Sequence, residues 1–510
     1  MDSDIRVRFA PSPTGGLHIG GVRTALYNYL FARKHKGRMV LRIEDTDRNR
    51  LVQGAEEYIT ESLAWCGIDV DESPSLGGPF GPYRQSERLD LYTTYVDQLL
   101  KEGKAYYAFD TPKELADLRN KLHEKKSSVQ HYGMLTRMDM NNSLSLSEEE
   151  VNRKIASGQP YVVRLLVPEG VTVFVNDLIR GQVKVSSDLL DDKILLKSDG
   201  FPTYHLANVV DDHLMKISHV IRGEEWLPSA PLHALLYQLL GWKESQPGFA
   251  HLPLLLKPEG TGKLSKRDAA KHGFPIFPIS WNNKASNEII RGFRESGYLP
   301  DALVNFLALL GWNPGGDQEI FSMDQLIREF SLERIGKAGA TFDINKLKWF
   351  NEHYLRNKPL DELADSFKHV AEEHGQTCSS KKALSIVSSL IDRVSFPDDF
   401  WNQGAVFFVS PTEYNPSIVR KKWTIEAGQI LSAFSVRLPN QAEGMAAEDI
   451  KQLLWEEADQ HGLSLGKVMP ALRIALTGGA GGPDLITIIQ ILGTNETKER
   501  IQSAVQHLTK

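Results

Sequence analysis

The stretch IRVRFAPSPTGGLHIGG occupies residues 5–21 and decides how the first part of the chain folds. Residues 5–10 alternate in the manner of a β-strand, and Val22 to Lys34 carries apolar residues on one helical face. A second strand is predicted from Met39 to Ile43. A strand, a glycine-rich turn, a helix and another strand form a βαβ unit, so the chain is predicted to begin with a parallel sheet of the nucleotide-binding type.

The turn PSPTGGLHIGG is itself a candidate ligand site. Glycines let the backbone approach a ligand closely, and the amides at a helix start attract anions. His18 could add a side-chain donor. The turn matches neither GxGxxG nor GxxxxGK[ST], and taken alone a connecting turn with a solvent-facing histidine is the simpler interpretation.

A second candidate is the basic loop GTGKLSKRD at residues 260–268. Its lysines and arginine suit the negative charge that develops during phosphoryl or nucleotidyl transfer. Alone it would be read as a solvated loop. Its position after the glycine-rich turn, with a split α/β pattern between them, favours a functional role.

The pattern along the rest of the chain changes twice. Residues 111–188 combine charged helical segments with short β-rich runs and are interpreted as an insertion, after which the strand-then-helix style returns. Beyond Pro275 the chain is predicted to be helical. The expected helices are Ala55 to Trp65, Leu89 to Lys101, Ser229 to Leu240, Asp301 to Leu310, Met323 to Phe330 and Asp361 to His374.

Composition sets broad limits on the class of protein. A chain of 510 residues with 41% hydrophobic and 24% charged residues predicts several globular domains. The net charge of −6 leaves nucleic-acid binding open, because a local basic groove can act on an acidic protein. Two cysteines exclude a disulfide framework, and no apolar run is long enough to span a membrane. We therefore expect a cytoplasmic protein without membrane association.

These motifs, taken in order, resemble the glutamyl-tRNA synthetase family of class I aminoacyl-tRNA synthetases. PSPTGGLHIGG carries the first signature, ordinarily HIGH, and KLSKR at 263–267 carries the second, ordinarily KMSKS. The resemblance extends over nearly the whole chain through RIEDTD at 42–47, GPYRQSER at 81–88, LLKSDGFPTYHLANVVDDH at 195–213, VIRGEEW at 220–226 and GKVMPALRIALTG at 466–478.

The resemblance implies a fold and its divisions. The expected fold class is α/β: a split Rossmann-type parallel-sheet catalytic domain with an α+β insertion, followed by an all-α anticodon-binding region. The expected boundaries are 1–110 and 189–275 for the two catalytic halves, 111–188 for an insertion that binds the tRNA acceptor end, 276–345 for a stem-contact helical domain and 346–510 for the anticodon-binding region.

The implied activity is ATP-dependent formation of glutamyl-adenylate and transfer of glutamate to the 3′ end of tRNA(Glu). Its partners would be L-glutamate, ATP with Mg²⁺ and the tRNA, and the chain is expected to act as a monomer. Neither step needs a protein nucleophile, so catalysis must depend on positioning and on phosphate charge. His18, Lys263 and Lys266 are the expected catalytic residues, and Gly20 and Ser265 would join them in binding ATP.

The signatures depart from the usual pattern at three positions. Gly21 replaces the second histidine, which is common in the glutamyl branch, and Leu264 and Arg267 replace methionine and serine. Both lysines of the second signature remain.

Glutamate presents two carboxylates and an ammonium, so its pocket needs arginines and an acid. Arg8 is the best candidate for the side-chain carboxylate, and Glu44 would face the ammonium. Taken singly, Arg8 could be a surface strand residue and Tyr204 a core aromatic. The positions that match the family's glutamate contacts are Arg8, Ser12, Glu44, Tyr204, Asn208 and Arg222.

The tRNA-facing residues are less well defined by the sequence. Asp47 could contact the tRNA end or cap its turn, and Arg393 could read the anticodon or lie on a helix surface. Many relatives hold zinc through a C-x-C motif in the insertion. Here Ala108 and Asp110 occupy those positions, so no structural zinc or other protein metal site is expected.

Alternative functions are a non-discriminating enzyme that also charges tRNA(Gln), and a catalytically inactive tRNA-binding homologue. A further alternative is the truncated paralogue that glutamylates a modified tRNA base and lacks the anticodon-binding region. The roughly 200 residues after Gly315 in this chain argue against it. A small-molecule nucleotidyltransferase would not explain RIEDTD, VIRGEEW or the helical extension.

Overall fold

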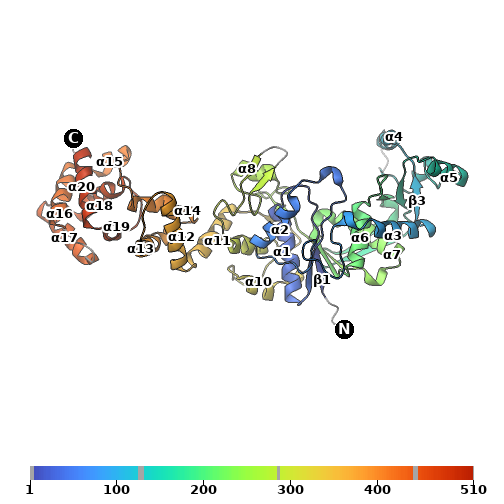
Figure 1. Cartoon of the computed structure of the whole chain (residues 1–510), viewed down its shortest axis with the longest axis horizontal. Helices are drawn as coiled ribbons and strands as arrows, with labels where there is room; N and C mark the ends of the chain where they lie inside the picture. The colour runs from blue at the N-terminus through green and yellow to red at the C-terminus, as the bar shows by residue number, and fades with distance from the viewer. Residues whose placement is uncertain (1–4, 125–130, 284–287, 440–445, 509–510) are drawn as a thin grey trace. The chain divides into compact units, whose positions relative to one another are not determined.

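The computed structural model describes residues 5–124, 131–283, 288–439 and 446–508. The chain divides into two compact units, Met1–Leu347 and Lys348–Lys510. The first contains α/β elements and the second is helical, as the colours of Figure 1 allow the reader to follow along the chain.

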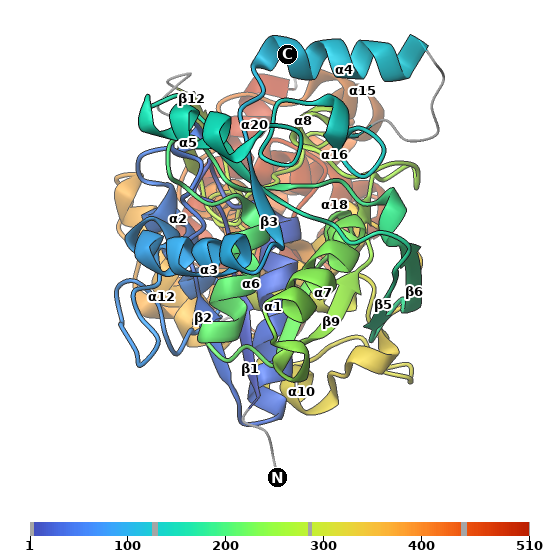
Figure 2. The same ribbon diagram turned by 90° about the vertical axis from the view of Figure 1, so that its right-hand side faces the viewer.

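A six-stranded sheet forms the centre of the first unit, in the order β2-β1-β8-β9-β5-β6. Neighbouring strands are parallel except for β6, which pairs antiparallel with β5 at the edge. Figure 2 shows the labelled strands in this sequence from β2 on the left to β6 on the right. The strands are β1 (Arg6–Phe9), β2 (Arg38–Leu41), β5 (Thr172–Asp177), β6 (Gly181–Ser186), β8 (His219–Gly223) and β9 (Gly248–Leu252).

Strand β1 lies inside the sheet and is buried along its whole length, although two of its four residues are arginines. Each arginine is neutralised by an acid from a distant segment. Arg6 forms two hydrogen bonds with Glu72 at 2.7 and 2.9 Å, and Arg8 donates through Nε to Asp212 at 3.0 Å. Arg8 is 3% exposed, so the alternative interpretation of it as a surface residue is wrong.

Helices cover both faces of this sheet. Helix α1 (Ile19–Lys34) packs on β1, β2 and β8. On the other face, α3 (Leu89–Lys101), α6 (Tyr204–Leu214) and α7 (Ala230–Leu239) share one hydrophobic core with Val40, Val220 and Phe249 of the strands. Helix α2 (Ala55–Trp65) packs beside α1. A parallel sheet covered on both faces is the arrangement that the sequence predicted.

Part of the predicted insertion belongs to the central sheet. Strands β5 and β6 lie within 111–188, yet β5 pairs with β9 and places Val173 and Val175 in the common core. The alternation of buried and exposed residues along β5 gives it one apolar face, which the sheet covers. The rest of the segment contains α4 (Pro112–Glu124), α5 (Glu148–Ala156) and an antiparallel sheet of β3 (Ala105–Ala108), β4 (Val162–Leu165) and β7 (Ile194–Leu196).

Residues that follow the central sheet complete the first unit. Helices α9 (Pro300–Leu309) and α10 (Met323–Glu329) both pack on α1. The remaining elements of this region are β10 (Leu255–Leu256), α8 (Lys266–His272), β11 (Trp281–Asn283), β12 (Glu288–Ile290), β13 (Ala340–Thr341) and α11 (Ile344–Arg356), which continues into the second unit.

The second unit is all-helical over the residues that the structure describes, and apolar residues of α16, α18 and α20 pack together within it. Its helices are α12 (Leu360–Glu373), α13 (Ser380–Leu390), α14 (Asp398–Gly404), α15 (Pro416–Lys422), α16 (Ile425–Arg437), α17 (Ala447–Gln460), α18 (Leu465–Thr477), α19 (Leu485–Leu492) and α20 (Thr494–Leu508). Across the described part of the chain, no helix combines the length and the apolar character needed to cross a membrane.

Candidate active site

A cavity of about 270 Å³ opens where β1, β8 and the start of α1 meet. It lies at the carboxyl ends of neighbouring parallel strands, where ligands bind in open α/β sheets. The predicted site residues that line it are Arg8, Ser12, His18, Gly20, Glu44, Tyr204, Asn208, Arg222 and Lys263. The structure thus brings together residues from segments up to 255 positions apart in the sequence.

The first signature turn fixes the orientation of His18. Its Nδ1 accepts a hydrogen bond from the amide of Gly20 at 3.0 Å and caps the N-terminus of α1. The remaining ring proton therefore lies on Nε2, which is left as a donor toward the cavity. Enclosure in the cavity, together with Lys263 and Lys266, lowers the pKa of His18 to about 4. At neutral pH His18 is an uncharged donor.

Close packing around the signature explains two of its glycines. A Cβ added at Gly20 would lie 2.7 Å from Cε1 of His18, and one added at Gly21 would lie 2.4 Å from Cδ1 of Leu17. A side chain at Gly20 would displace the capping imidazole. Gly21, where the usual signature has histidine, cannot take a side chain unless Leu17 moves.

The second signature lies beside the cavity and shapes the start of α8. Lys263 lines the cavity and forms an ion pair with Glu225 at 2.9 Å. Ser265 caps α8 and, with Asp268, forms a reciprocal capping box. Lys266 does not line the cavity, and its Nζ lies 5.0 Å from the ring centroid of Phe277. Ser265 is likewise outside the lining.

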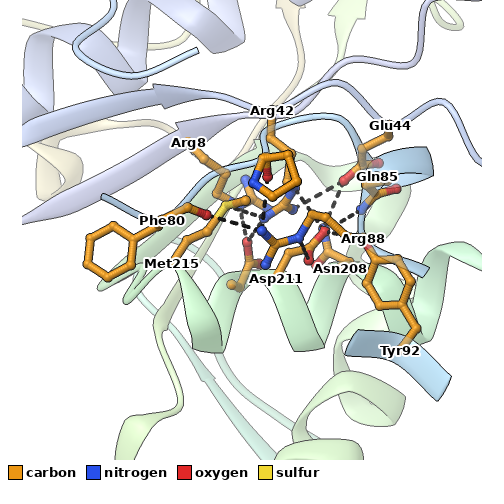
Figure 3. A network of polar contacts seen from close by, with 12 residues as sticks. Arg8, Arg42, Glu44, Phe80, Gln85, Arg88, Tyr92, Asn208, Asp211 and Met215 are labelled. Carbon is orange, nitrogen blue, oxygen red and sulfur yellow. Dashed lines mark hydrogen bonds and ion pairs between the residues drawn. The ribbon is translucent and has the colours of Figure 1, made fainter. Parts of the chain in front are cut away.

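A buried network of charges supports the Arg8 and Glu44 side of the cavity (Figure 3). Arg42 is fully buried and donates to Asp212 at 2.7 Å and to Glu44 at 3.2 Å. Asn208 is satisfied at both amide ends when its oxygen accepts from Arg42 at 3.1 Å and its nitrogen donates to Asp212 at 3.2 Å. Asp212 therefore links Arg8, Arg42 and Asn208 behind the cavity.

The same network sets the protonation of its acids. Burial would raise the pKa of Asp212, but Arg8 and Arg42 lower it overall, so Asp212 is ionised. Burial raises the pKa of Glu44, opposed by Arg42 and Arg8. An ammonium group placed against Glu44 would favour its charged form.

A further set of residues anchors the network from behind. Asp211 accepts from Arg88 at 2.7 Å, from Tyr92 at 2.9 Å and from Gln85 at 2.9 Å (Figure 3). The segments RIEDTD and VVDDH carry the family resemblance, but the sequence does not single out Arg42, Asp211 or Asp212 as site residues. Two features of the sequence could have revealed them. Arg42 is a lone arginine after an apolar strand, and Asp211 and Asp212 form an acidic pair on an otherwise apolar helix.

Tyr204 and Arg222 form another part of the cavity wall. Tyr204 accepts a hydrogen bond from Nη1 of Arg222 at 2.8 Å, and its ring lies 4.1 Å from that of Trp226. Burial raises the pKa of Tyr204 to about 12, so its phenol remains protonated. Glu225, which sequence reasoning also missed, lines the same cavity next to Lys263.

The two tRNA-facing candidates lie outside this cavity. Asp47 accepts from Arg50 at 2.6 Å in an exposed turn. Arg393 ends a short 3₁₀ helix, Ile391–Arg393, of the second unit and is exposed. In the insertion, Asp110 accepts from the amide of Asn141 and from Tyr132. Across the described ranges, no group of three or more His, Cys, Asp or Glu side chains is arranged to hold a metal ion.

The fold and this cavity define the class of protein. Residues 4–349 match the family model described as "tRNA synthetases class I (E and Q), catalytic domain", and residues 358–505 match an anticodon binding domain. The α/β unit and the helical unit therefore correspond to a class I aminoacyl-tRNA synthetase with its anticodon-binding domain.

Comparison with individual proteins narrows the class. The chain is 55% identical to a glutamate–tRNA ligase of Amoebophilus asiaticus over 99% of both chains, and 53% identical to that of Cytophaga hutchinsonii over 100% of this chain and 98% of the other. A crystal structure of a glutamate tRNA ligase from Elizabethkingia meningosepticum, in complex with its amino acid, superposes with a TM-score of 0.95 at 47% identity, covering 99% of this chain and 100% of that chain. The chain belongs to the glutamate–tRNA ligase family.

Proposed function

We propose that this chain activates L-glutamate with ATP to form glutamyl-adenylate and then transfers glutamate to the 3′ end of tRNA(Glu), releasing AMP and pyrophosphate. The observation that carries the proposal is the charge pattern of one cavity, which Arg8, Arg222 and Glu44 line together with His18 and Lys263. Glutamate has two carboxylates and one ammonium, which is the complement of that pattern.

Each substrate group has a matching side chain. Arg8 would bind the side-chain carboxylate, since Asp212 holds its Nε and leaves the other end of the guanidinium for substrate. Glu44 would face the ammonium. Ser12, Tyr204, Asn208 and Arg222 would complete the glutamate pocket.

The ATP side requires donors and cations rather than a nucleophile. His18, Gly20 and Lys263 would bind the phosphates from the cavity wall, with Lys266 and Ser265 joining when the second signature approaches the nucleotide. The glutamate carboxylate then attacks the α-phosphorus, and these groups stabilise the negative charge that develops. Mg²⁺ would accompany ATP and offset the charge of its phosphates, which needs few protein ligands.

A second cavity of about 450 Å³ suits the tRNA acceptor end. Tyr204 lines both cavities, so the second adjoins the proposed glutamate pocket. Its lining includes one acid, Asp191, and the cations Arg119, Arg164 and Lys193, which can bind a nucleotide backbone. We assign acceptor-end binding to the part of 111–188 outside the central sheet, and propose Asp47 as a contact to that end.

We further propose that 276–345 contacts the tRNA stem and that 346–510 reads the anticodon. An apolar cavity of about 370 Å³ in the second unit carries Lys422 and Arg473 among Ile418, Met469 and Pro470. Apolar walls with cations at the rim can hold an unstacked base. Arg393 lies close enough to Arg473 to lower the pKa of its guanidinium, after the larger effect of burial, and would add positive charge there.

The proposed glutamate and ATP residues all lie in the first compact unit, and we propose that the enzyme acts as a monomer. We place the enzyme in the cytoplasm, where its two buried free cysteines would stay reduced.

The test is ATP–pyrophosphate exchange with glutamate, glutamine or aspartate, each with and without tRNA, followed by charging of purified tRNA(Glu) and tRNA(Gln). We expect exchange and charging with glutamate alone among the amino acids. Preference for glutamine or aspartate would overturn the substrate assignment. Binding of tRNA without exchange would identify an inactive homologue, and charging of both tRNAs a non-discriminating enzyme.

A further inference from the structure

Arg222 is buried without a carboxylate partner among the described residues. It is 5% exposed, and its guanidinium donates to His251 Nε2 at 3.0 Å, to the Tyr204 hydroxyl at 2.8 Å and to the backbone oxygen of Trp226 at 3.4 Å. Arg8, by contrast, forms an ion pair with Asp212. A buried cation whose partners are all neutral retains its full attraction for an anion.

His251 holds Arg222 from the side away from the cavity. The two residues face each other in the register of β8 and β9, and His251 is completely buried. Its Nδ1 lies 2.5 Å from Oδ2 of Asp177, the last residue of β5. Oδ1 of Asp177 accepts the amides of Ile179 at 3.0 Å and Arg180 at 2.7 Å, so the carboxylate cannot rotate freely.

This arrangement admits only one placement of the imidazole proton. Nε of Arg222 can only donate, so Nε2 of His251 must accept and carries no proton. The proton then lies on Nδ1 and is donated to Asp177. Burial and the positive charges of Arg222 and Arg180 lower the pKa of His251 despite the opposing effect of Asp177, which keeps the ring neutral.

A second pair of histidines flanks the same guanidinium. Nδ1 of His233 lies 3.4 Å from Nη1 of Arg222, and Nε2 of His233 lies 3.2 Å from Nδ1 of His205. Burial, followed by Arg222, lowers the pKa of His233 well below its ordinary value. Neutral imidazoles therefore surround Arg222 on two sides without cancelling its charge.

We propose that Asp177 and His251 are positioning residues that aim the uncompensated charge of Arg222 at a carboxylate of the amino-acid substrate. Asp177 fixes the tautomer of His251, and His251 fixes the guanidinium. This inference rests on the proposed function, in which Arg222 binds glutamate. It assigns a role to β5, a strand that contributes no residue to the cavity lining and lies between β9 and β6 in the central sheet.

Asp177→Asn tests the relay with almost no change in volume. The amide oxygen is needed to accept from Ile179 and Arg180, so the NH₂ group would face Nδ1 of His251. His251 would then accept at Nδ1 and carry its proton on Nε2, where it would meet the N–H of Arg222. We expect KM for glutamate to rise about tenfold or more and KM for ATP to change less than about twofold, because only the glutamate wall is disturbed.

A double-mutant cycle separates this role from a merely structural one. In His251→Gln, the side-chain oxygen replaces Nε2 as an acceptor for Arg222 and no longer needs Asp177 to set a tautomer. Adding Asp177→Asn to His251→Gln should therefore raise KM for glutamate no further. In addition, ¹⁵N-histidine spectra should place the proton of His251 on Nδ1 in the wild-type protein and on Nε2 in Asp177→Asn.

Asp188→Asn is the matched control: the Asp188 carboxylate accepts from the amide of Gly170 at 2.9 Å and from the hydroxyl of Ser186 at 3.2 Å in a turn after β6, so both KM values should stay unchanged. If the wild-type enzyme activates glutamate but Asp177→Asn keeps the wild-type KM, or if the two substitutions are additive, the relay is refuted. If the wild-type enzyme does not activate glutamate, the proposed function fails, while the tautomer spectra still test the geometry.

Discussion

Arg8 and Arg222 bring two guanidinium groups to one cavity, but they are stabilised in different ways. Arg8 shares Asp212 with Arg42, so part of its charge is neutralised before substrate binds. Arg222 is held by neutral acceptors. The pocket can therefore bind one carboxylate by hydrogen-bond geometry at Arg8 and another by net charge at Arg222, which suits a substrate with two carboxylates.

Arg8→Ala should raise KM for glutamate by about 100-fold, equivalent to about 2.7 kcal/mol, while KM for ATP changes little. The fold should persist because Asp212 keeps its ion pair with Arg42. Exchange kinetics at varied glutamate and ATP measure both constants.

Arg8→Lys keeps the charge but loses the planar fork and should recover only part of the affinity. Arg38→Ala, which removes an exposed arginine of β2, is the control and should match the wild-type enzyme. Equal rises in both KM values would contradict the assignment of Arg8.

His18 should remain neutral well below neutral pH, because enclosure in the cavity and two lysines lower its pKa to about 4. An NMR titration of ¹³Cε1-labelled histidine, with the signal assigned from His18→Asn, should show no charging of His18 between pH 8 and pH 5. Lys263→Ala removes one of the cations and should move the midpoint upward, toward 6.5. A wild-type midpoint near 6.5 would show that the cavity and its lysines do not keep His18 neutral below neutral pH.

At the scale of secondary structure, local patterns predicted the elements, and long-range pairing could not be predicted from them. The helices Ala55–Trp65 and Leu89–Lys101 have the predicted bounds, because apolar spacing marks them directly. Strand β5 was assigned to the insertion, since nothing in its alternation shows that its partner is β9, more than 70 residues later.

The candidate site divides in the same way. The predicted residues that line the cavity lie in segments with recognisable motifs, which is why the sequence points to them, although Glu225 in VIRGEEW is not among those predicted. The side chains behind them could not be found by motif, because a buried acid such as Asp212 or Asp177 reveals its partner only once distant strands and helices pack. Arg42 was missed for the same reason, although it lies two residues before Glu44.

Helix α8 connects the second signature to the fold, and its capping box should control the order of that signature. Asp268 bonds to Ser265 and forms an ion pair with Lys257 at 2.9 Å, so Asp268→Ala removes both restraints. A lost cap costs about 1 kcal/mol, which corresponds to a several-fold rise in KM for ATP. Hydrogen exchange of residues 264–273 should accelerate. Glu150→Ala breaks the equivalent capping box of α5 and should leave KM for ATP unchanged. Faster hydrogen exchange with an unchanged KM for ATP would show that the order of α8 does not affect ATP binding.

At the scale of the whole molecule, the chain consists of two compact units, and each matches a different family model. All the residues proposed to bind glutamate and ATP lie in the first unit, while Arg393 lies in the second. Substitutions in the second unit should therefore affect tRNA selection without affecting the small substrates.

Arg393→Ala tests this division of function. Arg393 is exposed and close to Arg473, so the two form a local positive site on an otherwise helical unit. Loss of a base contact costs about 1–3 kcal/mol, so KM for tRNA(Glu) should rise about tenfold and the ratio of tRNA(Glu) to tRNA(Gln) charging should change. KM for glutamate and for ATP should stay at wild-type values.

Arg420→Ala, which removes an exposed arginine of α15, is the control. If Arg420 contacts phosphate, Arg420→Ala should weaken the binding of tRNA(Glu) and tRNA(Gln) equally, because phosphate contacts carry no sequence information. An unchanged tRNA ratio in Arg393→Ala would remove Arg393 from anticodon reading and leave its role as a surface residue.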